Sequence, residues 1–420
     1  MTRPSTGDYL LQVPDAVARI LADVQRLGAE TLPLLSAMGR VLASDAVAGV
    51  TLPPWDNSAM DGYAVRAADL ASVPVSLAVL ETVAAGQFAT KPVGAGESIR
   101  IMTGAPLPAG ADSVVRVEDT DGGTVRVEIR SARDAGKNVR PRGEDIVEGR
   151  VAIPAGTVLG AAQVGVLASI GLAQVLVHRA PRVAILTSGD ELVELDGFAA
   201  VRDGRKIVTS NSYTLQAAVR AMGAKPEYLG IAADTPGSLR AMLERARGAD
   251  LILTSAGISV GEFDHVRDVL TTLGAEMKFW RVRMRPGAPI GFGLLHGTPW
   301  LGLPGNPVST LVTFELFARP AIRRMMGHRR LFRRPIPVVL EESVTISAEL
   351  THFLRATITH GPAGTTARLT GPQSSGILTS MSLANALLVV PADRLRSEAG
   401  ETLQAIPLGD EADMAVDFAL

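Results

Sequence analysis

The stretch from residue 248 to residue 270, GADLILTSAGISVGEFDHVRDVL, constrains this chain most, because its pattern is that of one strand–loop–helix unit. The apolar run Leu251–Leu253 follows a turn and is typical of a buried strand in a parallel sheet. Small residues extend from Thr254 to Gly261, and helical spacing of apolar residues begins at Val266. We therefore expect an α/β domain in which free N–H groups of this loop bind an anion such as phosphate.

Two carboxylates, Glu262 and Asp264, stand in the expected first turn of that helix. Acidic residues stabilise a helix N-terminus on their own. If a phosphate also binds there, a divalent cation is needed between the anions. Mg²⁺ suits this arrangement because it commonly takes one or two carboxylates together with phosphate oxygens. An ordinary strand-to-helix turn without a ligand is the alternative, and this stretch alone favours neither.

The composition of the whole chain excludes several classes of protein. A length of 420 residues predicts about two to four domains, and 47% hydrophobic with 20% charged residues is typical of a soluble globular protein. A formal net charge of −2 gives no basic field for nucleic acid. The absence of cysteine excludes disulfides, thiolate zinc sites and a cysteine nucleophile, and the six histidines lack the spacing of a zinc hydrolase.

One uncharged segment, residues 158–177, is long enough to cross a bilayer. Three glycines and two glutamines interrupt it, so we interpret it as a short helix over 158–170 followed by a strand over 173–178. The N-terminus lacks the apolar core of a signal peptide. We therefore expect no membrane association and a cytoplasmic location.

The order of patterns along the chain predicts several domains. Helical spacing is expected over 14–27 and 33–44, and short β-like runs over 75–80, 98–102, 113–117 and 124–129. Strands then alternate with helices from 181 to 327, which predicts a sandwich with a mostly parallel sheet. We predict a multidomain α/β plus β fold: a discontinuous helical and extended domain of residues 1–46 and 147–179, an inserted β-rich lobe of 47–146, an α/β domain of 180–330, and a small barrel-like β-domain of 331–420.

Three loops of the predicted α/β domain follow strands, at the sheet edge where such folds bind ligands. They run from Thr187 to Glu191, from Ser255 to Asp264 and from Leu303 to Pro307. Together they favour a pocket for an anion or a nucleotide. Asp234 follows another strand, where it is equally well interpreted as the N-cap of the next helix.

Three arginines, Arg281, Arg283 and Arg285, alternate with apolar residues. In one strand this spacing places three guanidinium groups on one face. Because such charges repel unless anions neutralise them, phosphate or another oxyanion is the expected partner. A solvated edge strand is the alternative.

Nine segments in order resemble the molybdopterin molybdenumtransferase family, which includes a relative in the C-terminal region of gephyrin. They cover nearly the whole chain: DNSAMDGYAV at 56–65, IMTGAPLPAGADSVVRVED at 101–119, RPRGEDI at 140–146, ILTSGDELVE at 185–194, SNSYTL at 210–215, SAGISVGEFD at 255–264, RPGAPIGFG at 285–293, LPGNPVS at 303–309 and GPQSSGILTSMSLANAL at 371–387.

The resemblance implies an activity and its partners. Adenylylated molybdopterin and molybdate are the implied substrates, with Mg²⁺ as cofactor, and the metal enters the dithiolene as AMP leaves. An elongated homodimer is implied, with an active site between the α/β domain of one subunit and the β-rich lobe of the other. A molybdopterin adenylyltransferase is the implied upstream partner.

The resemblance also assigns site residues. Catalytic roles fall to Asp61, Asp145, Glu191, Asp234 and Asp264, the last three as Mg²⁺ ligands. Substrate binding falls to Thr103, Ser188, Gly189, Asp190, Ser255, Gly257, Ser259, Gly261, Arg281, Arg285, Pro304, Gly305, Asn306 and Pro307.

Four positions depart from the family pattern, and at two of them, Arg281 and Arg285, arginine stands where the family commonly has lysine. Ala256 stands where glycine is usual, which bears on whether the backbone there takes a positive φ. Ala288 stands where lysine is common, and we expect weaker or altered anion binding. Two other functions remain open: an adenylyltransferase-like enzyme, which would share only the α/β domain, and a non-catalytic pterin-binding scaffold. The choice between molybdate and tungstate also remains open.

Overall fold

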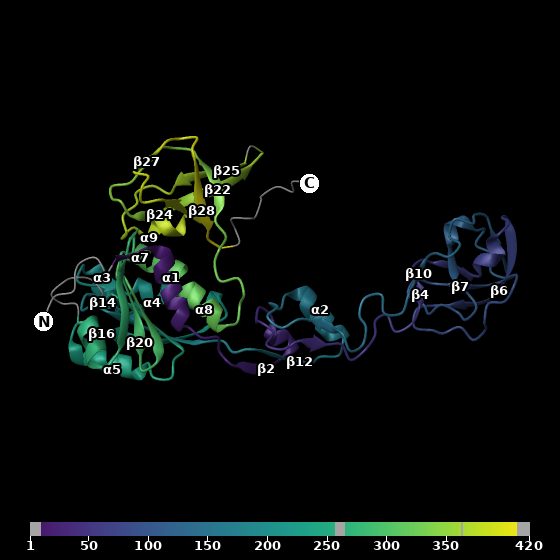
Figure 1. Cartoon of the computed structure of the whole chain (residues 1–420), viewed down its shortest axis with the longest axis horizontal. Helices are drawn as coiled ribbons and strands as arrows, with labels where there is room; N and C mark the ends of the chain where they lie inside the picture. Colours follow the sequence, from purple (N-terminus) through teal and green to yellow (C-terminus); the bar gives the residue numbers. More distant parts are fainter. Residues whose placement is uncertain (1–9, 257–264, 363, 410–420) are drawn as a thin grey trace. The chain divides into compact units, whose positions relative to one another are not determined.

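A computed structural model describes residues 10–256, 265–362 and 364–409. Contacts within the chain gather into two units (Figure 1). Unit 1 consists of Met1–Thr31, Gly39–Ala43 and Leu176–Leu420, and unit 2 of Leu32–Met38 and Ser44–Val175. The four domains expected from the sequence, with their boundaries, stay a prediction.

The centre of unit 1 is a seven-stranded sheet with the order β1-β18-β20-β21-β17-β13-β16. Strands β16, β13, β17 and β21 lie side by side and run parallel, whereas β20 is antiparallel to both of its neighbours. The sheet is therefore mostly parallel, as predicted. Its strands are β1 Leu10–Leu11, β13 Arg182–Ser188, β16 Lys225–Ala232, β17 Leu251–Ser255, β18 Glu276–Val282, β20 Pro289–Leu295 and β21 Thr298–Leu303.

Helices cover both faces of this sheet (Figure 1). Every residue of β17 is buried, as expected for a strand packed on both sides. One apolar core includes residues of α1 Val13–Asp23, α4 Ser210–Ala221, α7 Pro307–Thr313, the π-helix Phe314–Ala318 and α8 Arg319–Met325. The other core includes residues of α5 Pro236–Arg245 and α6 Val266–Thr272.

The C-terminal part of unit 1 is a closed five-stranded barrel, which confirms the predicted barrel-like domain. The ring closes because β24 pairs with both β25 and β26, while β28 pairs with both β22 and β26 and β22 pairs with β25. Its elements are β22 Ile336–Leu340, β24 Thr351–Gly361, β25 Gly364–Leu369, β26 Ala386–Val390 and β28 Thr402–Pro407, with β23 Val344–Thr345, β27 Arg396–Ser397 and α9 Leu378–Ser382 beside them.

Unit 2 contains the β-rich lobe. A five-stranded sheet has the order β8-β5-β7-β6-β9, with apolar clusters on its two faces. All four predicted β-like runs are confirmed here as strands. The elements are β3 Ala46–Val47, β4 Asn57–Ser58, β5 Gly62–Val65, β6 Val75–Val83, β7 Glu97–Ile101, β8 Ser113–Arg116, β9 Arg126–Ile129, β10 Val139–Arg140, β11 Val151–Ile153 and α2 Ala161–Ser169.

The uncharged segment divides as expected, into α2 and the strand β12 Gln174–His178. Within the part of the chain that the structure describes, no helix combines the length and the apolarity that crossing a membrane requires.

The helix predicted over residues 33–44 is wrong. Strand β2 Ala29–Pro33 ends there and a single 3₁₀ turn, Leu34–Ala37, follows. Gly39 has φ of 78°, a left-handed conformation that stops a right-handed helix. Leu35 is 80% exposed and Met38 is 62% exposed, whereas Val41 and Leu42 are buried, so the expected apolar stripe does not form one buried helical face.

A glycine at the sheet centre of unit 2 gives the first prediction. A Cβ on Gly62 in β5 would lie 1.9 Å from the carbonyl oxygen of Val115 in β8, whereas a Cβ on Gly49 has nothing within 4 Å. We predict that Gly62→Ala lowers the free energy of unfolding by about 1–3 kcal/mol, and that Gly49→Ala changes it by less than about 0.5 kcal/mol. Urea unfolding of both variants checks this. Equal midpoints would contradict the close packing of β5 on β8.

Candidate functional site

The first cavity, here called the strand-end pocket, lies at the carboxyl ends of the parallel strands and has a volume of about 590 Å³. Register places Thr187 of β13 beside Ser255 of β17, and Ser255 beside Leu303 of β21. The described residues of the three expected loops, with Ser255 and Ala256 from the middle one, therefore meet at this edge. The site residues among its lining are Ser188, Glu191, Ser255, Pro304, Gly305, Asn306 and Pro307.

Asn211 at the start of α4 joins these loops. Its Nδ2 donates to Ser255 Oγ at 2.8 Å and to the carbonyl oxygen of Gly305 at 2.7 Å. Ser255 Oγ in turn donates to the carbonyl oxygen of Pro304 at 3.3 Å. The buried Oδ1 of Asn211 has no hydrogen-bond partner among the described residues. Because an unpaired buried acceptor is costly, the pocket offers this oxygen to a donor or a cation.

Glu191 brings a carboxylate to the same pocket. Gly189 has φ of 150°, and a Cβ there would lie 2.7 Å from both carboxylate oxygens of Glu191. Only glycine therefore leaves room for the Glu191 side chain in this position.

Asp190 and Asp234 bind each other reciprocally. The N–H of Asp234 donates to Asp190 Oδ1 at 3.1 Å, and the N–H of Asp190 donates to Asp234 Oδ2 at 3.3 Å. Lys206 Nζ donates to the carbonyl oxygen of Asp190. The N-cap of α5 is Thr235, whose Oγ1 accepts from the N–H of Ser238. The interpretation of Asp234 as that N-cap is therefore wrong.

The residues fit a magnesium ion only in part. Among the residues that the structure describes, no three His, Asp or Glu side chains form a group that could hold a metal. Magnesium, however, commonly takes one or two protein carboxylates and completes its shell with phosphate and water oxygens. Glu191 and the unpartnered Asn211 Oδ1 are oxygen ligands of the kind it prefers.

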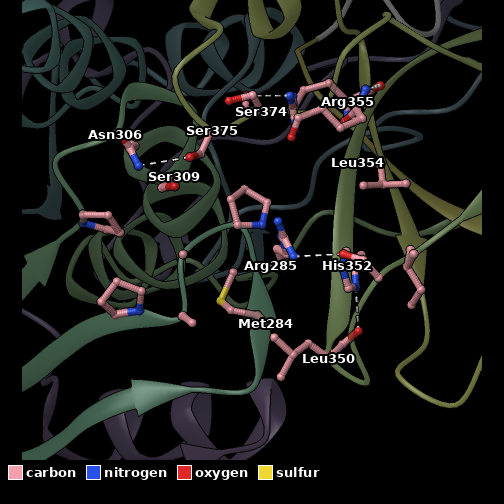
Figure 2. A pocket seen from close by; sticks show the side chains of 18 of the residues that line it. Met284, Arg285, Asn306, Ser309, Leu350, His352, Leu354, Arg355, Ser374 and Ser375 are labelled. Carbon is pink, nitrogen blue, oxygen red and sulfur yellow. Dashed lines mark hydrogen bonds between the residues drawn. The ribbon is translucent and has the colours of Figure 1, made fainter. Parts of the chain in front are cut away.

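A second cavity, here called the barrel-side pocket, lies between the sheet and the barrel within unit 1 and has a volume of about 750 Å³. It shares Pro289, Pro304 and Asn306 with the strand-end pocket, so the two cavities adjoin. Figure 2 shows side chains from both sides, with Asn306 and Ser309 opposite Leu354 and Arg355 of the barrel strand β24.

Arg355 is a buried cation with no acidic partner among the described residues. It is 0% exposed, and its Nε donates to Ser380 Oγ at 3.0 Å. Its other nitrogens donate to the carbonyl oxygens of Pro372 at 3.2 Å, Gln373 at 3.2 Å and Ser374 at 2.9 Å. Burial lowers the pKa of Arg355, but arginine stays protonated in proteins. Within the part of the chain that the structure describes, only neutral oxygens solvate this positive charge in the pocket wall, which favours an anion in the cavity.

Arg285 adds a second cation to the lining of this pocket. Its Nη1 donates to Ser347 Oγ at 3.1 Å (Figure 2). His352 beside it is buried, and burial together with the Arg285 charge lowers the pKa of His352. Its Nδ1 lies 2.8 Å from the carbonyl oxygen of Leu350, which requires Nδ1–H in the neutral ring. Two guanidinium groups with serine hydroxyls around a cavity can bind a tetrahedral oxyanion.

The three alternating arginines do not share one strand, so that prediction is wrong. Arg281 lies in β18 of the large sheet, whereas Arg285 lies in β19, Met284–Arg285, which pairs with β24 of the barrel. Arg283 lies between the two strands and donates from Nη2 to the carbonyl oxygen of Glu349 at 3.1 Å. Of the three, only Arg285 lines one of the two cavities.

Unit 2 contains three of the predicted site residues, and two of them are in contact. The N–H and Oγ1 of Thr103 both donate to Asp61 Oδ1 at 2.7 Å, and these bonds lower the pKa of Asp61, so its carboxylate is ionised at neutral pH. Asp145 is exposed in the neighbouring loop, where its N–H donates to the carbonyl oxygen of Leu52. Asp61, Thr103 and Asp145 thus belong to loops of one unit.

Part of the expected site lies outside the described residues: Gly257, Ser259, Gly261, Glu262 and Asp264. Ala256, which immediately precedes them, has φ of 78°. The left-handed backbone that glycine usually provides is therefore kept with alanine, at a steric cost.

Sequence reasoning missed Asn211, His352 and Arg355 as site residues. Arg355 has a visible signal, because it is a charged residue inside the apolar run of a strand, Phe353–Ile358. Asn211 and the loop that Arg355 holds lie in segments already quoted for the resemblance, but their chemistry depends on contacts far along the chain.

Comparisons with known proteins match three successive parts of the chain. Three family models match: MoeA N-terminal region (domain I and II) over residues 11–171, "Probable molybdopterin binding domain" over 184–324, and MoeA C-terminal region (domain IV) over 337–408. A relative named molybdopterin molybdenumtransferase 2, from Mycobacterium tuberculosis, is 40% identical over 92% of this chain and 97% of its own. Molybdopterin molybdenumtransferase from a Nostoc species is 36% identical over 90% and 88%.

A solved structure agrees. The molybdopterin biosynthesis moeA protein of Pyrococcus horikoshii has a TM-score of 0.82 and 28% identity, covering 95% of this chain and all of its own. Together with these relatives, the fold defines a multidomain α/β enzyme with two adjoining pockets. The chain belongs to the molybdopterin molybdenumtransferase family, a family of transferases.

The strained alanine generates the second prediction. A Cβ on Gly305 would lie 3.3 Å from Ala256 Cβ. We predict that Ala256→Gly relieves up to about 1 kcal/mol of backbone strain, and that Gly305→Ala destabilises the chain less in the Ala256→Gly background than in the wild type. Unfolding of both single variants and the double variant measures this coupling. Additive effects would contradict the contact between the two loops.

Proposed function

We propose that this enzyme inserts molybdenum from molybdate into adenylylated molybdopterin and releases AMP, the last step of molybdenum-cofactor synthesis. The observation that carries the proposal is the pair of adjoining cavities, one with oxygen ligands at strand ends and one with two arginines. Family membership supports the same activity.

The strand-end pocket suits the phosphorylated pterin. Loops after parallel strands offer backbone N–H groups to phosphate, and Asn211, Ser255 and Gly305 hold these loops in register. Pro304 and Asn306 line both cavities, so a pterin bound beside them has its sulfur end within reach of the second pocket.

The barrel-side pocket suits molybdate. Arg285 and Arg355 supply positive charge, and serines of the wall supply hydroxyl donors. Ala288, at a position where lysine is common in the family, also lines this pocket. The chain therefore relies on its arginines to hold the oxyanion.

Magnesium would be held by Glu191, Asp234 and Asp264, of which Asp264 lies outside the described residues. When bound, the ion would neutralise charge on the phosphates while the phosphoanhydride bond breaks. Gly189 supports this role for Glu191, because it leaves room for the carboxylate beside the loop.

Unit 2 is proposed to act on the same substrate from the partner subunit of a homodimer, through Asp61, Thr103 and Asp145. The carboxylate of Asp61 is held ready in its ionised form by Thr103. A molybdopterin adenylyltransferase is the proposed source of the substrate, and a cytoplasmic location is proposed with it.

The activity is tested by incubating the purified enzyme with adenylylated molybdopterin and Mg²⁺, with and without molybdate. Molybdate-dependent release of AMP, together with active cofactor, is expected. Formation of the adenylylated compound from ATP would instead favour an adenylyltransferase. Tight binding without release of AMP would favour a scaffold.

The oxyanion assignment gives the third prediction. Arg285→Ala should raise the molybdate concentration for half-maximal rate by roughly ten-fold or more, since a charged hydrogen bond is lost. Arg368→Ala is the matched control, because Arg368 is exposed on the same barrel and lines neither cavity. Steady-state kinetics with varied molybdate measures both. An equal effect of the two variants would show that Arg285 has no special role.

The shared site gives the fourth prediction. Asp61→Asn and Asp234→Asn should each abolish transfer, and a refolded mixture of the two should recover activity. Recovery is expected because a hybrid dimer keeps one intact site built from one wild-type copy of each residue. Activity assays of the mixture, beside a mixture of two Asp61→Asn preparations, measure it. A mixture as inactive as its control would contradict a site shared between subunits.

A further inference from the structure

An exposed aromatic pair in unit 2 has no part in the activity described so far. Trp55 and Phe88 have ring centroids 4.9 Å apart with planes at 73°, an edge-to-face contact. Trp55 is 36% exposed and Phe88 is 61% exposed. The other two tryptophans, Trp280 and Trp300, are buried and stack on each other. Large aromatic surface left in water at one spot is typical of a binding site.

Arg142 holds the loop that presents Trp55, through the residue before Trp55 and the residue after it. The Nε of Arg142 donates to the carbonyl oxygen of Pro54 at 3.1 Å, and its backbone N–H donates to Asp56 Oδ1 at 2.7 Å. The carbonyl oxygen of Asp56 accepts from the N–H of Leu107 at 2.8 Å. Trp55 therefore stands on a fixed backbone.

The loop that presents Phe88 is fixed separately, by Glu81. One carboxylate oxygen of Glu81 accepts from the N–H groups of Thr90 at 2.8 Å and Lys91 at 2.9 Å. The other accepts from Thr90 Oγ1 at 2.9 Å. Because two independent networks hold the two rings, the aromatic surface is formed before any ligand arrives, and binding costs little ordering.

The chemistry of this surface selects a flat ring that bears phosphate. An edge-to-face pair leaves ring faces that the partner ring does not cover, and fused heterocycles stack on such faces. Exposed guanidinium groups of Arg140 and Arg142 lie on the adjoining segments, since Arg140 pairs with Asn57 across β10 and β4.

Backbone hydrogen bonds connect the segment that carries Trp55 to the Asp61–Thr103 pair. The N–H of Gly104 donates to the carbonyl oxygen of Ser58 at 2.8 Å, and the N–H of Ser58 donates to the carbonyl oxygen of Ala105 at 3.0 Å. These bonds tie the segment between Trp55 and Asp61 to the segment that follows Thr103.

We propose that Trp55 and Phe88 bind the fused heterocycle of the phosphorylated substrate, its adenine or its pterin, with Arg142 at the phosphate. The inference rests on the function proposed above and adds residues that recognise the substrate. A stacking pair of this kind determines affinity and orientation of the substrate and takes no part in proton transfer.

The test is tryptophan fluorescence of the full-length enzyme, titrated with AMP and, separately, with pterin-6-carboxylate. Quenching that disappears in Trp55→Phe, which keeps the buried Trp280 and Trp300, reports on Trp55. Saturable quenching by one of the two probes is expected, and the probe that quenches identifies the ring. Quenching by neither overturns the proposal.

Variants give a readout besides fluorescence. Trp55→Ala should weaken binding of the quenching probe, measured by equilibrium dialysis, by roughly ten-fold or more, whereas Trp55→Phe should largely restore it. In turnover, KM for the substrate should rise more than kcat falls. Val125→Ala, an exposed apolar position of the same unit, is the matched control and should change neither.

Failure of this proposal is distinct from failure of the proposed function. Normal probe binding and turnover in Trp55→Ala and Phe88→Ala would overturn the aromatic site while leaving molybdenum insertion standing. A change in self-association alone would mean that the pair contacts protein, which also overturns it. Loss of probe binding in a chain without molybdate-dependent turnover would keep the aromatic site and reject the function.

Discussion

The buried guanidinium of Arg355 is the constraint on which the site depends. A charge taken out of water must be solvated by the protein, and here the carbonyl oxygens of Pro372, Gln373 and Ser374 do so together with Ser380. These bonds fix the loop that forms one wall of the barrel-side pocket. The same loop reaches the start of α7, because the N–H of Val308 donates to the carbonyl oxygen of Ser375 at 3.1 Å.

The path of the chain explains why two cavities adjoin. After β18 the backbone leaves the large sheet, pairs briefly with the barrel as β19, and returns as β20. Arg285 is thereby carried to the barrel side, while the loops of β13, β17 and β21 stay at the sheet edge. An oxyanion and a phosphorylated ligand can thus occupy neighbouring spaces with different charge environments.

Much of the fold could be predicted from the sequence, because buried strands such as β17 are continuous apolar runs and helix starts such as Asn306-Pro307 have local signals. The prediction of a helix over 33–44 was wrong, because the spacing of apolar residues in a sequence does not show whether all of them lie against a buried core. The prediction that the three arginines share one strand was wrong, because the chain passes from the large sheet to the barrel between Arg281 and Arg285 without a local signal in the sequence.

The candidate site could likewise be predicted only where the sequence carries a local signal. Loops at strand ends were predictable, because parallel strands bring their carboxyl ends to one edge. The roles of Asn211 and Arg355 were not, since each depends on partners brought near only by the fold.

The most direct measurement is anomalous diffraction from crystals of the enzyme soaked in tungstate, a heavy analogue of molybdate. The central claim is that the positive wall formed by Arg355 and Arg285 holds the oxyanion beside the substrate pocket. An anomalous peak in the barrel-side pocket, near Arg285 and Ser374, is the predicted result. A peak elsewhere in a well-occupied crystal, with the barrel-side pocket empty, would contradict the account.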